Sequence, residues 1–432
     1  MNYLKLLLRR LMGIDIIKVF SLNAVSTLIR MLAGIISVKI VAAIIGPAGV
    51  ALIGQLNNIT SILLGVANGC INNGITKYVA EYREDKLEIR KLLSNALRIT
   101  LFFTFIVALF LIVFHNYLSR WIMLSDEYGY IFLIFGFTIV LYTLNALLIS
   151  VLNGFREFRK YVAVNICGTF IGLIFSITLV FFWGLTGAMI NAVTFQSVMF
   201  FVTLWMCRKY QWMKLCNFSG HLDSIVIRRY LGYSLMAFTT LSLGPVSQML
   251  LRGYVISEVS IIEAGWWEAM NRISSMYLSV ITTSFAVYYL PRLSEIKDNL
   301  ELHHEIFRCY KVIVPILIIV TVVIYLLRHF VIWLLFTSDF YPMERFFIWQ
   351  MLGDFFKIAS WLLSYLMVAK AMTKAFITTE VIFTLFFIGL GYVFIHVNGT
   401  IGLTQAYMIN YILYLSCMVI MFRRTLFPTK YE

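Results

Sequence analysis

The chain is dominated by apolar runs of about twenty residues, and these runs decide what it can fold into. An α-helix rises about 1.5 Å per residue, so about 20 apolar residues match the roughly 30 Å hydrocarbon core of a bilayer. In lipid the backbone polar groups must be paired internally, which such a run achieves as a helix. We place twelve runs, at residues 18–45, 49–72, 92–114, 128–151, 161–182, 186–207, 230–256, 265–289, 311–335, 345–369, 373–395 and 400–422. The sequence therefore predicts an all-α polytopic membrane protein with about 12 transmembrane helices.

The composition excludes several other classes of protein. It is 61% hydrophobic and 13% charged, with a mean hydropathy of +0.87, whereas soluble domains are about 45–50% apolar and about 25% charged. The net charge of +14 would suit nucleic acid, but the basic residues lie between apolar runs and form no continuous soluble face. The six cysteines form no CxxC pair, and no histidines lie near them at zinc spacing. We expect neither a nucleic-acid partner nor a metal site.

The basic residues also predict the orientation in the membrane. With the N-terminus inside, 27 of the 35 Lys and Arg residues fall in inside segments, and only Arg120, Arg328 and Arg345 fall outside. Lys and Arg gather in the cytoplasmic loops of membrane proteins. Both termini are therefore expected in the cytoplasm.

A weak internal repeat divides the chain. FSLNAVSTL begins at Phe20 and YSLMAFTTL begins at Tyr233, an offset of 213 residues. Since each half then holds six runs, we expect two six-helix lobes related as a parallel repeat. The predicted parts are a cytoplasmic amphipathic segment (1–17), an N-lobe (18–207), a cytoplasmic linker (208–229), a C-lobe (230–422) and a cytoplasmic tail (423–432).

Five basic residues lie inside the predicted spans: Arg30, Lys39, Arg252, Arg272 and Lys357. A cation at the centre of a transmembrane helix costs about 2.5–3.5 kcal/mol on insertion scales, so such residues point to a function. The repeat offset places Lys39 on Arg252, and the five predict a cationic cavity for an anionic ligand. Local explanations stay open for several of them. A structural contact with a neighbouring span would account for Arg30, snorkelling for Lys39, and an ion pair with Glu268 for Arg272.

Other polar residues in the spans have two interpretations each. Asp354 lies three residues before Lys357, so the two form either a neutralised pair or a switch that couples transport to an ion. The amides Gln55, Asn57, Asn58 and Asn73 lie in or at the end of the second run, where they either contact sugar hydroxyls or join helices.

Four stretches carry a resemblance to a known family: NNGITKYVAEY (72–82), SFAVYYLPRLS (284–294), WQMLGDFFKIASWLLSYLMVAKA (349–371) and TQAYMINYILY (404–414). They resemble the Wzx flippases of the multidrug/oligosaccharidyl-lipid/polysaccharide (MOP) superfamily, which also contains the MATE exporters and the lipid II flippase MurJ. The resemblance runs from about residue 20 to residue 422. It implies two six-helix lobes with a central cavity that opens to either side in turn.

The resemblance implies a function as well. Such a flippase moves undecaprenyl-diphosphate-linked O-antigen units, or related oligosaccharides, from the inner to the outer leaflet of the bacterial inner membrane, for lipopolysaccharide assembly. Enterobacterial common antigen is the alternative substrate. The implied partners are the lipid-linked oligosaccharide, membrane lipids, the polysaccharide polymerase and the chain-length regulator. We expect no cofactor and no enzymatic activity. No GxxxxGK[ST] motif for ATP is present, so we expect the energy to come from gradients or from consumption of the product. Coupling to H⁺ or Na⁺ stays open.

Two other functions are weighed against this one. A MATE-like exporter of organic cations would favour carboxylates in its spans, but here the cations outnumber Asp354 and Glu380. A membrane polysaccharide polymerase or glycosyltransferase needs a sizeable loop with catalytic groups at the membrane surface. The outer loops are too short for that, and the charged inner loop 77–98 reads as a solvated amphipathic helix.

Overall fold

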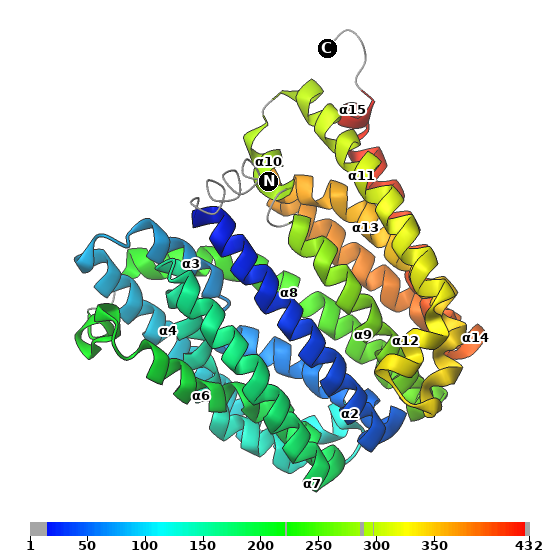
Figure 1. The fold of residues 1–432 in the computed structure, drawn as a ribbon, viewed down its shortest axis with the longest axis horizontal. Helices are drawn as coiled ribbons and strands as arrows, with labels where there is room; N and C mark the ends of the chain where they lie inside the picture. Colours follow the sequence, from blue (N-terminus) through cyan, green and yellow to red (C-terminus); the bar gives the residue numbers. More distant parts are fainter. Residues whose placement is uncertain (1–14, 221–222, 286–288, 297, 428–432) are drawn as a thin grey trace, which may run out of the picture. The chain divides into compact units, whose positions relative to one another are not determined.

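The computed structural model describes residues 15–220, 223–285, 289–296 and 298–427, and this part of the chain is helical and contains no strand (Figure 1). The prediction of an all-α protein is confirmed. Of the predicted terminal segments, residues 1–14 and 428–432 lie outside the described residues, as do residues 221–222 of the predicted linker.

By their contacts the residues form two compact units. Unit 1 comprises Ile59–Leu241 and the chain up to Ile44, and unit 2 comprises Ile45–Asn58 and the chain from Ser242 onward. Two helices contribute residues to both units, α2 (Asp15–Ala67) and α8 (Ser224–Glu258). The predicted division into lobes 18–207 and 230–422 stays a prediction.

Unit 1 is built around three long helices that lie side by side, α4, α6 and α7 (Figure 1). Its remaining elements are short. The bounds are α3 (Asn72–Glu81), α4 (Lys86–Val113), α5 (His115–Leu118), the π-helix η1 (Ser119–Met123), α6 (Gly129–Gly154), α7 (Phe158–Cys207) and the 3₁₀ turns η2 (Gln211–Met213) and η3 (Leu215–Phe218).

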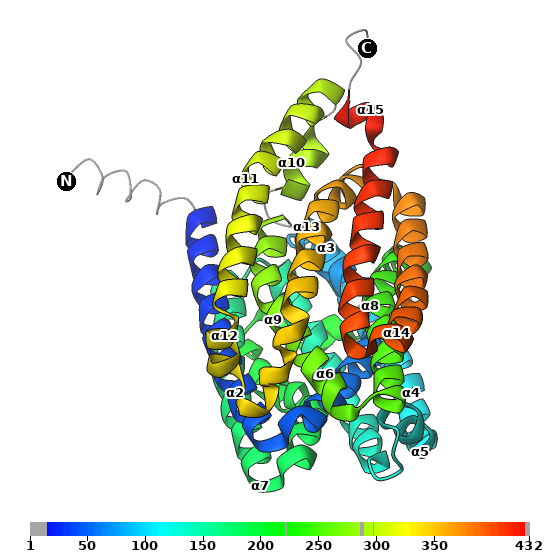
Figure 2. The same cartoon turned by 90° about the vertical axis from the view of Figure 1, so that its right-hand side faces the viewer.

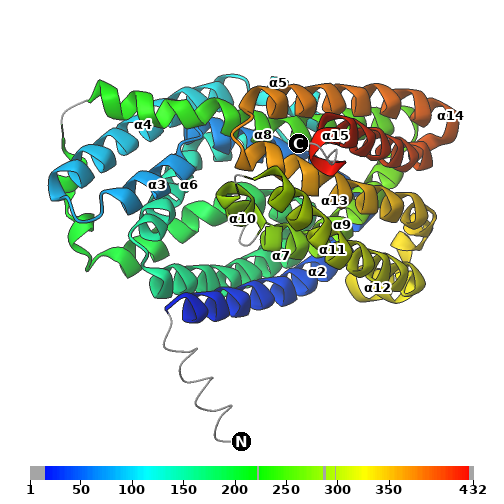
Figure 3. The ribbon, with the colours of Figure 1, turned by 90° about the horizontal axis from the view of Figure 1, so that it is seen from above.

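Unit 2 packs α13 against α14 (Figure 2) and α11 against α13 (Figure 3). Its bounds are α9 (Ile261–Ser284), α10 (Leu290–Glu295), α11 (Asn299–Leu326), α12 (Arg328–Leu335), the 3₁₀ segment η5 (Ser338–Phe346), α13 (Phe347–Ala369), α14 (Thr373–Met421) and α15 (Arg423–Leu426). Polar N-caps begin two of these helices, since the side chains of Ser260 and Asp298 accept backbone N–H bonds at the starts of α9 and α11.

Three of the longest helices are broken at a glycine. Gly46 in α2, Gly184 in α7 and Gly399 in α14 have φ values of +66°, +54° and +60°, a left-handed conformation that glycine adopts without strain. In α14 the Tyr414 hydroxyl donates to Glu380 Oε1 at 2.9 Å. These residues are 34 positions apart, which on a straight helix would be about 50 Å. The chain therefore folds back at Gly399, and α14 is a helical hairpin.

A second glycine follows each break after three residues, at Gly49, Gly187 and Gly402. A Cβ on Gly187 would lie 1.9 Å from the carbonyl oxygen of Leu179, and one on Gly402 would lie 2.0 Å from that of Phe394. No side chain fits there, so the returning helix passes directly against the end of the preceding one.

The outer surfaces of the helices are apolar. Phe102, Phe105, Phe137 and Phe181 are 63% to 73% exposed, which in water would be unfavourable but suits contact with lipid. Seven of the described helices are long and apolar enough to cross a membrane, and the three glycine-broken helices are among them. The chain is thus a multi-pass membrane protein. The number of crossings and the side of the termini stay predictions.

Candidate functional site

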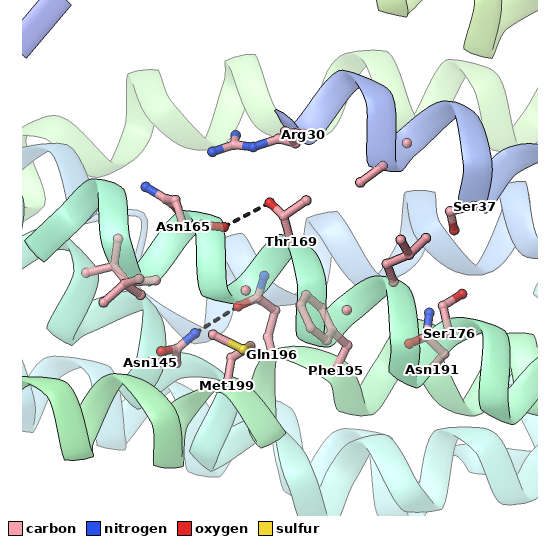
Figure 4. A pocket seen from close by; sticks show the side chains of 17 residues that line it. Arg30, Ser37, Asn145, Asn165, Thr169, Ser176, Asn191, Phe195, Gln196 and Met199 are labelled. Atoms are coloured by element: carbon pink, nitrogen blue, oxygen red, sulfur yellow. Dashed lines mark hydrogen bonds between the residues drawn. The ribbon is translucent and has the colours of Figure 1, made fainter. Parts of the chain in front are cut away.

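A polar pocket of about 390 Å³ lies within unit 1, and we call it the Arg30 pocket. It is formed by α2, α6 and both arms of α7. Figure 4 shows Arg30 extending from α2 over Asn165 and Thr169, with Asn145 and Gln196 on the opposite wall. The polar residues that line it are Arg30, Ser37, Asn145, Asn165, Thr169, Ser176, Asn191 and Gln196.

Amide groups supply most of the polarity of the Arg30 pocket. Asn145 Nδ2 donates to Gln196 Oε1 at 2.8 Å, and the Thr169 hydroxyl donates to the backbone carbonyl of Asn165 at 2.9 Å. The Oδ1 atoms of Asn145 and Asn191 are buried and have no hydrogen-bond partner within the described chain. A buried acceptor without a donor is costly, so this wall is suited to ligand hydroxyl or N–H groups.

The charge of the Arg30 pocket has one sign. Arg30 is exposed, and among the described residues that line the pocket it alone is charged. Among the described residues no carboxylate forms an ion pair with it. The guanidinium is therefore available to an anionic ligand, which it can bind through two parallel N–H bonds.

In unit 2 the predicted residues Arg252 and Arg272 share one carboxylate. Arg252 Nη2 lies 2.5 Å from Glu268 Oε2, and Arg272 Nε lies 3.0 Å from Glu268 Oε1. Arg252 Nη1 also donates to Gln55 Oε1 at 3.1 Å. The Arg252 side chain is 0% exposed. The predicted ion pair between Arg272 and Glu268 is present, but Glu268 also neutralises Arg252, which the sequence did not indicate.

Gly54 makes room for this Arg252–Glu268–Arg272 triad. A Cβ at Gly54 would lie 2.7 Å from the carboxyl carbon of Glu268 and 3.0 Å from Cζ of Arg252. The second arm of α2, which carries Gln55, therefore approaches α8 and α9 closely through a residue without a side chain.

Asp354 and Lys357 are not a simple pair. The Asp354 carboxylate accepts hydrogen bonds from the hydroxyls of Ser274 (2.6 Å), Tyr407 (2.8 Å) and Tyr277. Lys357 Nζ instead lies 5.0 Å from the ring centroid of Trp361, 5.6 Å from that of Tyr407 and 5.4 Å from that of Tyr411. Three aromatic faces stabilise a cation well. Among the described residues Asp354 and Lys357 make no direct ion pair, and a switch role for them stays a prediction.

The other predicted residues are dispersed. Lys39 is half-buried on α2 in unit 1, and Asn73 is exposed on α3. In unit 2 Asn57 is exposed, while Asn58 Nδ2 donates to Gln248 Oε1 at 3.4 Å. Gln55 Nε2 donates to the carbonyl of Met249 at 3.2 Å, so this amide joins helices. The roles of these residues in substrate binding stay predictions.

Sequence reasoning missed the amides that line the Arg30 pocket. Asn145, Asn165, Asn191 and Gln196 are isolated polar residues in the fourth, fifth and sixth apolar runs. A polar side chain in a predicted span is itself a signal, because it is expensive unless it faces the protein interior. Extending the search for amides beyond the second run would have found them. Within the described residues no group of three or more His, Cys, Asp or Glu side chains is placed to hold a metal.

The fold is similar to that of solved transporters of the MOP superfamily. An inward-facing multidrug resistance MATE family transporter superimposes with a TM-score of 0.71 at 14% identity, over 92% of this chain and 95% of that chain. The lipid II flippase MurJ, in an inward closed conformation, superimposes with a TM-score of 0.70 at 16% identity, over 94% and 87%. At these identities the likeness concerns the fold alone, and it confirms the predicted MATE/MurJ-like fold.

The sequence defines the family more narrowly. Residues 16–297 match the polysaccharide biosynthesis protein family, and the chain belongs to that family. It is similar to proteins named lipid III flippase from Escherichia coli (strain K12) and from Shigella flexneri, with 29% identity over 395 residues, which is 91% of this chain and 95% of each relative.

Proposed function

We propose that this protein is a flippase that moves lipid-linked oligosaccharide from the inner to the outer leaflet of the bacterial inner membrane. The chain is similar to proteins named lipid III flippase, and the similarity covers 95% of the length of each. O-antigen units, or a related surface polysaccharide, are the proposed cargo. The polysaccharide polymerase and the chain-length regulator are the proposed protein partners.

The observation that carries this proposal is the Arg30 pocket, where a cation without an ion-pair partner among the described residues faces a wall of amides. The prenyl tail of the substrate stays in lipid, but the diphosphate and the sugars must cross about 30 Å of hydrocarbon. There, a polar group without partners costs several kcal/mol. Arg30 suits a phosphate oxygen, and the Asn145 and Asn191 acceptors suit sugar hydroxyls. Transport of organic cations would be served by a carboxylate, and the described residues that line this pocket include none.

The direction of transport agrees with the charge of the cargo. A negative group that moves outward from a negative interior gains up to about 2.3 kcal/mol per elementary charge at 100 mV. The chain has no P-loop motif for ATP. We propose that the membrane potential, consumption of the product outside, or coupling to H⁺ or Na⁺ supplies the energy.

The test is deletion of the gene, complemented by Arg30→Gln, Arg30→Lys or wild-type protein. The measurements are the lipid-linked oligosaccharide that accumulates on the inner leaflet and the polysaccharide at the cell surface. Loss of a charge-assisted hydrogen bond of about 1.5–3 kcal/mol should lower transport by Arg30→Gln about 10- to 100-fold. Arg30→Lys keeps the charge and should retain part of the activity.

The matched control is Arg120→Gln. Arg120 is exposed in the π-helix η1 and pairs with Asp126, and that contact raises the pKa of Arg120. A solvent-exposed pair of this kind contributes little, so transport should stay normal. Immunoblots of membranes must show equal amounts of all variants. Normal polysaccharide with Arg30→Gln would overturn the role of the pocket, and a deletion strain without accumulated lipid-linked oligosaccharide would overturn the function.

A further inference from the structure

We propose that unit 2 holds a binding site for a phospholipid with an ethanolamine-type headgroup, in a cavity between α9 and α11. The cavity has a volume of about 570 Å³, within the range of about 300–1,000 Å³ that small-molecule sites occupy. It lies outside the Arg30 pocket, the triad and the Asp354 cluster. The proposal does not depend on the proposed flippase function.

The cavity has one polar end and apolar walls, an arrangement that matches the headgroup and acyl chain of a lipid. Its polar end is formed by Tyr289, Glu305 and Arg308, and its walls beyond are apolar. Glu305 lies six residues after Asn299, about 9 Å into α11, and Leu317 lies about 18 Å deeper along the helix. The hydrocarbon of one leaflet is about 15 Å thick. The walls therefore match the length of one acyl chain whose headgroup lies at the polar end.

Part of the cavity wall is exposed at the surface of the helices. Val280 on α9 is 50% exposed, and Val312 and Ile316 on α11 are 56% and 48% exposed. Phe285, Cys309 and Leu317 form the inner side and belong to the hydrophobic core of unit 2. An acyl chain can enter from the lipid and contact apolar atoms on both sides.

The polar end has an acidic and a basic side chain, which favours a ligand that carries both a positive and a negative group. Glu305 is 6% exposed, and its Oε1 atom is buried without a hydrogen-bond partner in the described chain. Arg308 lies one turn further on the same helix and is exposed. Among the described residues no ion pair joins Glu305 to Arg308. An ammonium group would satisfy Glu305 while the adjacent phosphate binds Arg308.

Other membrane lipids fit this end less well. A choline headgroup has the same two charges, but its quaternary nitrogen has no N–H to donate to Glu305 Oε1. A glycerol headgroup offers hydroxyls but leaves the Glu305 carboxylate without a counter-charge. A prenyl diphosphate would place two phosphates beside that buried carboxylate. The geometry thus favours a primary ammonium next to a phosphate.

The experiment is native mass spectrometry of the full-length protein with phosphatidylethanolamine, phosphatidylcholine or phosphatidylglycerol of the same acyl chains. Wild-type protein should retain phosphatidylethanolamine about tenfold more tightly than the other two, the value of one charge-assisted hydrogen bond. Glu305→Gln should abolish the preference for ethanolamine over choline. Arg308→Ala should weaken the binding of all three phospholipids, and Ile316→Trp should fill the cavity and do the same.

The control variant is Glu301→Gln, which removes an exposed carboxylate from the same helix and should change nothing. Equal thermal unfolding curves must show that each variant is folded. Equal retention of the three lipids by wild-type protein, or an unchanged preference in Glu305→Gln, would overturn the proposal. Because lipid retention is measured without transport, Arg30→Gln should keep it, and failure of this proposal is distinguishable from failure of the flippase function.

Discussion

Replacement of Glu268 by Gln should destabilise the protein more than any other single change in the Arg252–Glu268–Arg272 triad. Arg252 is fully buried and Glu268 supplies its carboxylate at 2.5 Å, so the variant leaves a buried cation without a counter-charge. Removing one partner of a buried ion pair costs about 3–5 kcal/mol. The Arg272 side chain is 20% exposed and can turn to a more polar environment, so the loss of its ion pair with Glu268 adds little to the cost.

The reverse change tests the physical cause. Arg252→Met leaves Glu268 paired with Arg272, so no charge is stranded, and we expect a cost of only about 1–2 kcal/mol. The double variant Arg252→Met/Glu268→Gln removes the stranded cation and should be more stable than Glu268→Gln alone. A coupling of about 2–3 kcal/mol between the two changes is then expected.

The assay is reversible unfolding by sodium dodecyl sulfate in mixed micelles, followed by circular dichroism. Glu263→Gln is the matched control on α9, because Glu263 pairs with Arg345 at 2.7 Å nearer the surface. Such a pair contributes about 0–1 kcal/mol. The reasoning is refuted if Glu268→Gln costs no more than Glu263→Gln, or if Arg252→Met proves the more damaging of the two changes.

Two further predictions concern α14 and the Asp354 cluster. Gly399→Ala should lower the unfolding free energy by about 1–2 kcal/mol, because φ is +60° at this position. A Cβ there would meet nothing within 4 Å, so the cost comes from the backbone conformation and not from a clash. Gly389→Ala, equally unhindered but at ordinary helical φ, should be neutral or slightly stabilising in the same micelle assay, and equal effects of the two changes would contradict this. Asp354→Asn should cost about 1.5–3 kcal/mol, because the hydroxyls of Ser274 and Tyr407 lose a charged acceptor. An unchanged unfolding curve would show that the carboxylate charge is not what these donors stabilise.

Much of the fold follows from local properties of the sequence. Each of the twelve predicted apolar runs falls mainly on a helix of the described structure, with the breaks in α2, α7 and α14 at glycines between adjacent runs. The reason is that a bilayer demands internally paired backbone over a fixed length, and this demand is met residue by residue. The positions of the costly cations could be read in the same way.

The partners of those cations could not be read from the sequence. The ion pair of Arg272 with Glu268 could be predicted because residues four positions apart on one helix share a face. The contact of Arg252 with the same carboxylate joins α8 to α9. Gln55 accepts a hydrogen bond from Arg252 across from α2, and this close approach depends on the absence of a side chain at Gly54. Such contacts depend on how each helix is rotated and how closely it packs, and uniformly apolar helices carry little periodic signal for either.

The sequence by itself thus determined that this chain is a bundle of membrane helices and that several of its predicted spans contain costly charged residues. The tertiary structure decided which charge is neutralised and which is free to bind. The charge of Arg252 is neutralised by Glu268 inside unit 2, whereas Arg30 lies among amides that converge from α6 and α7. The physical reason is distance: hydropathy is a property of neighbouring residues, but a counter-charge acts only within a few ångströms, which folding alone brings about.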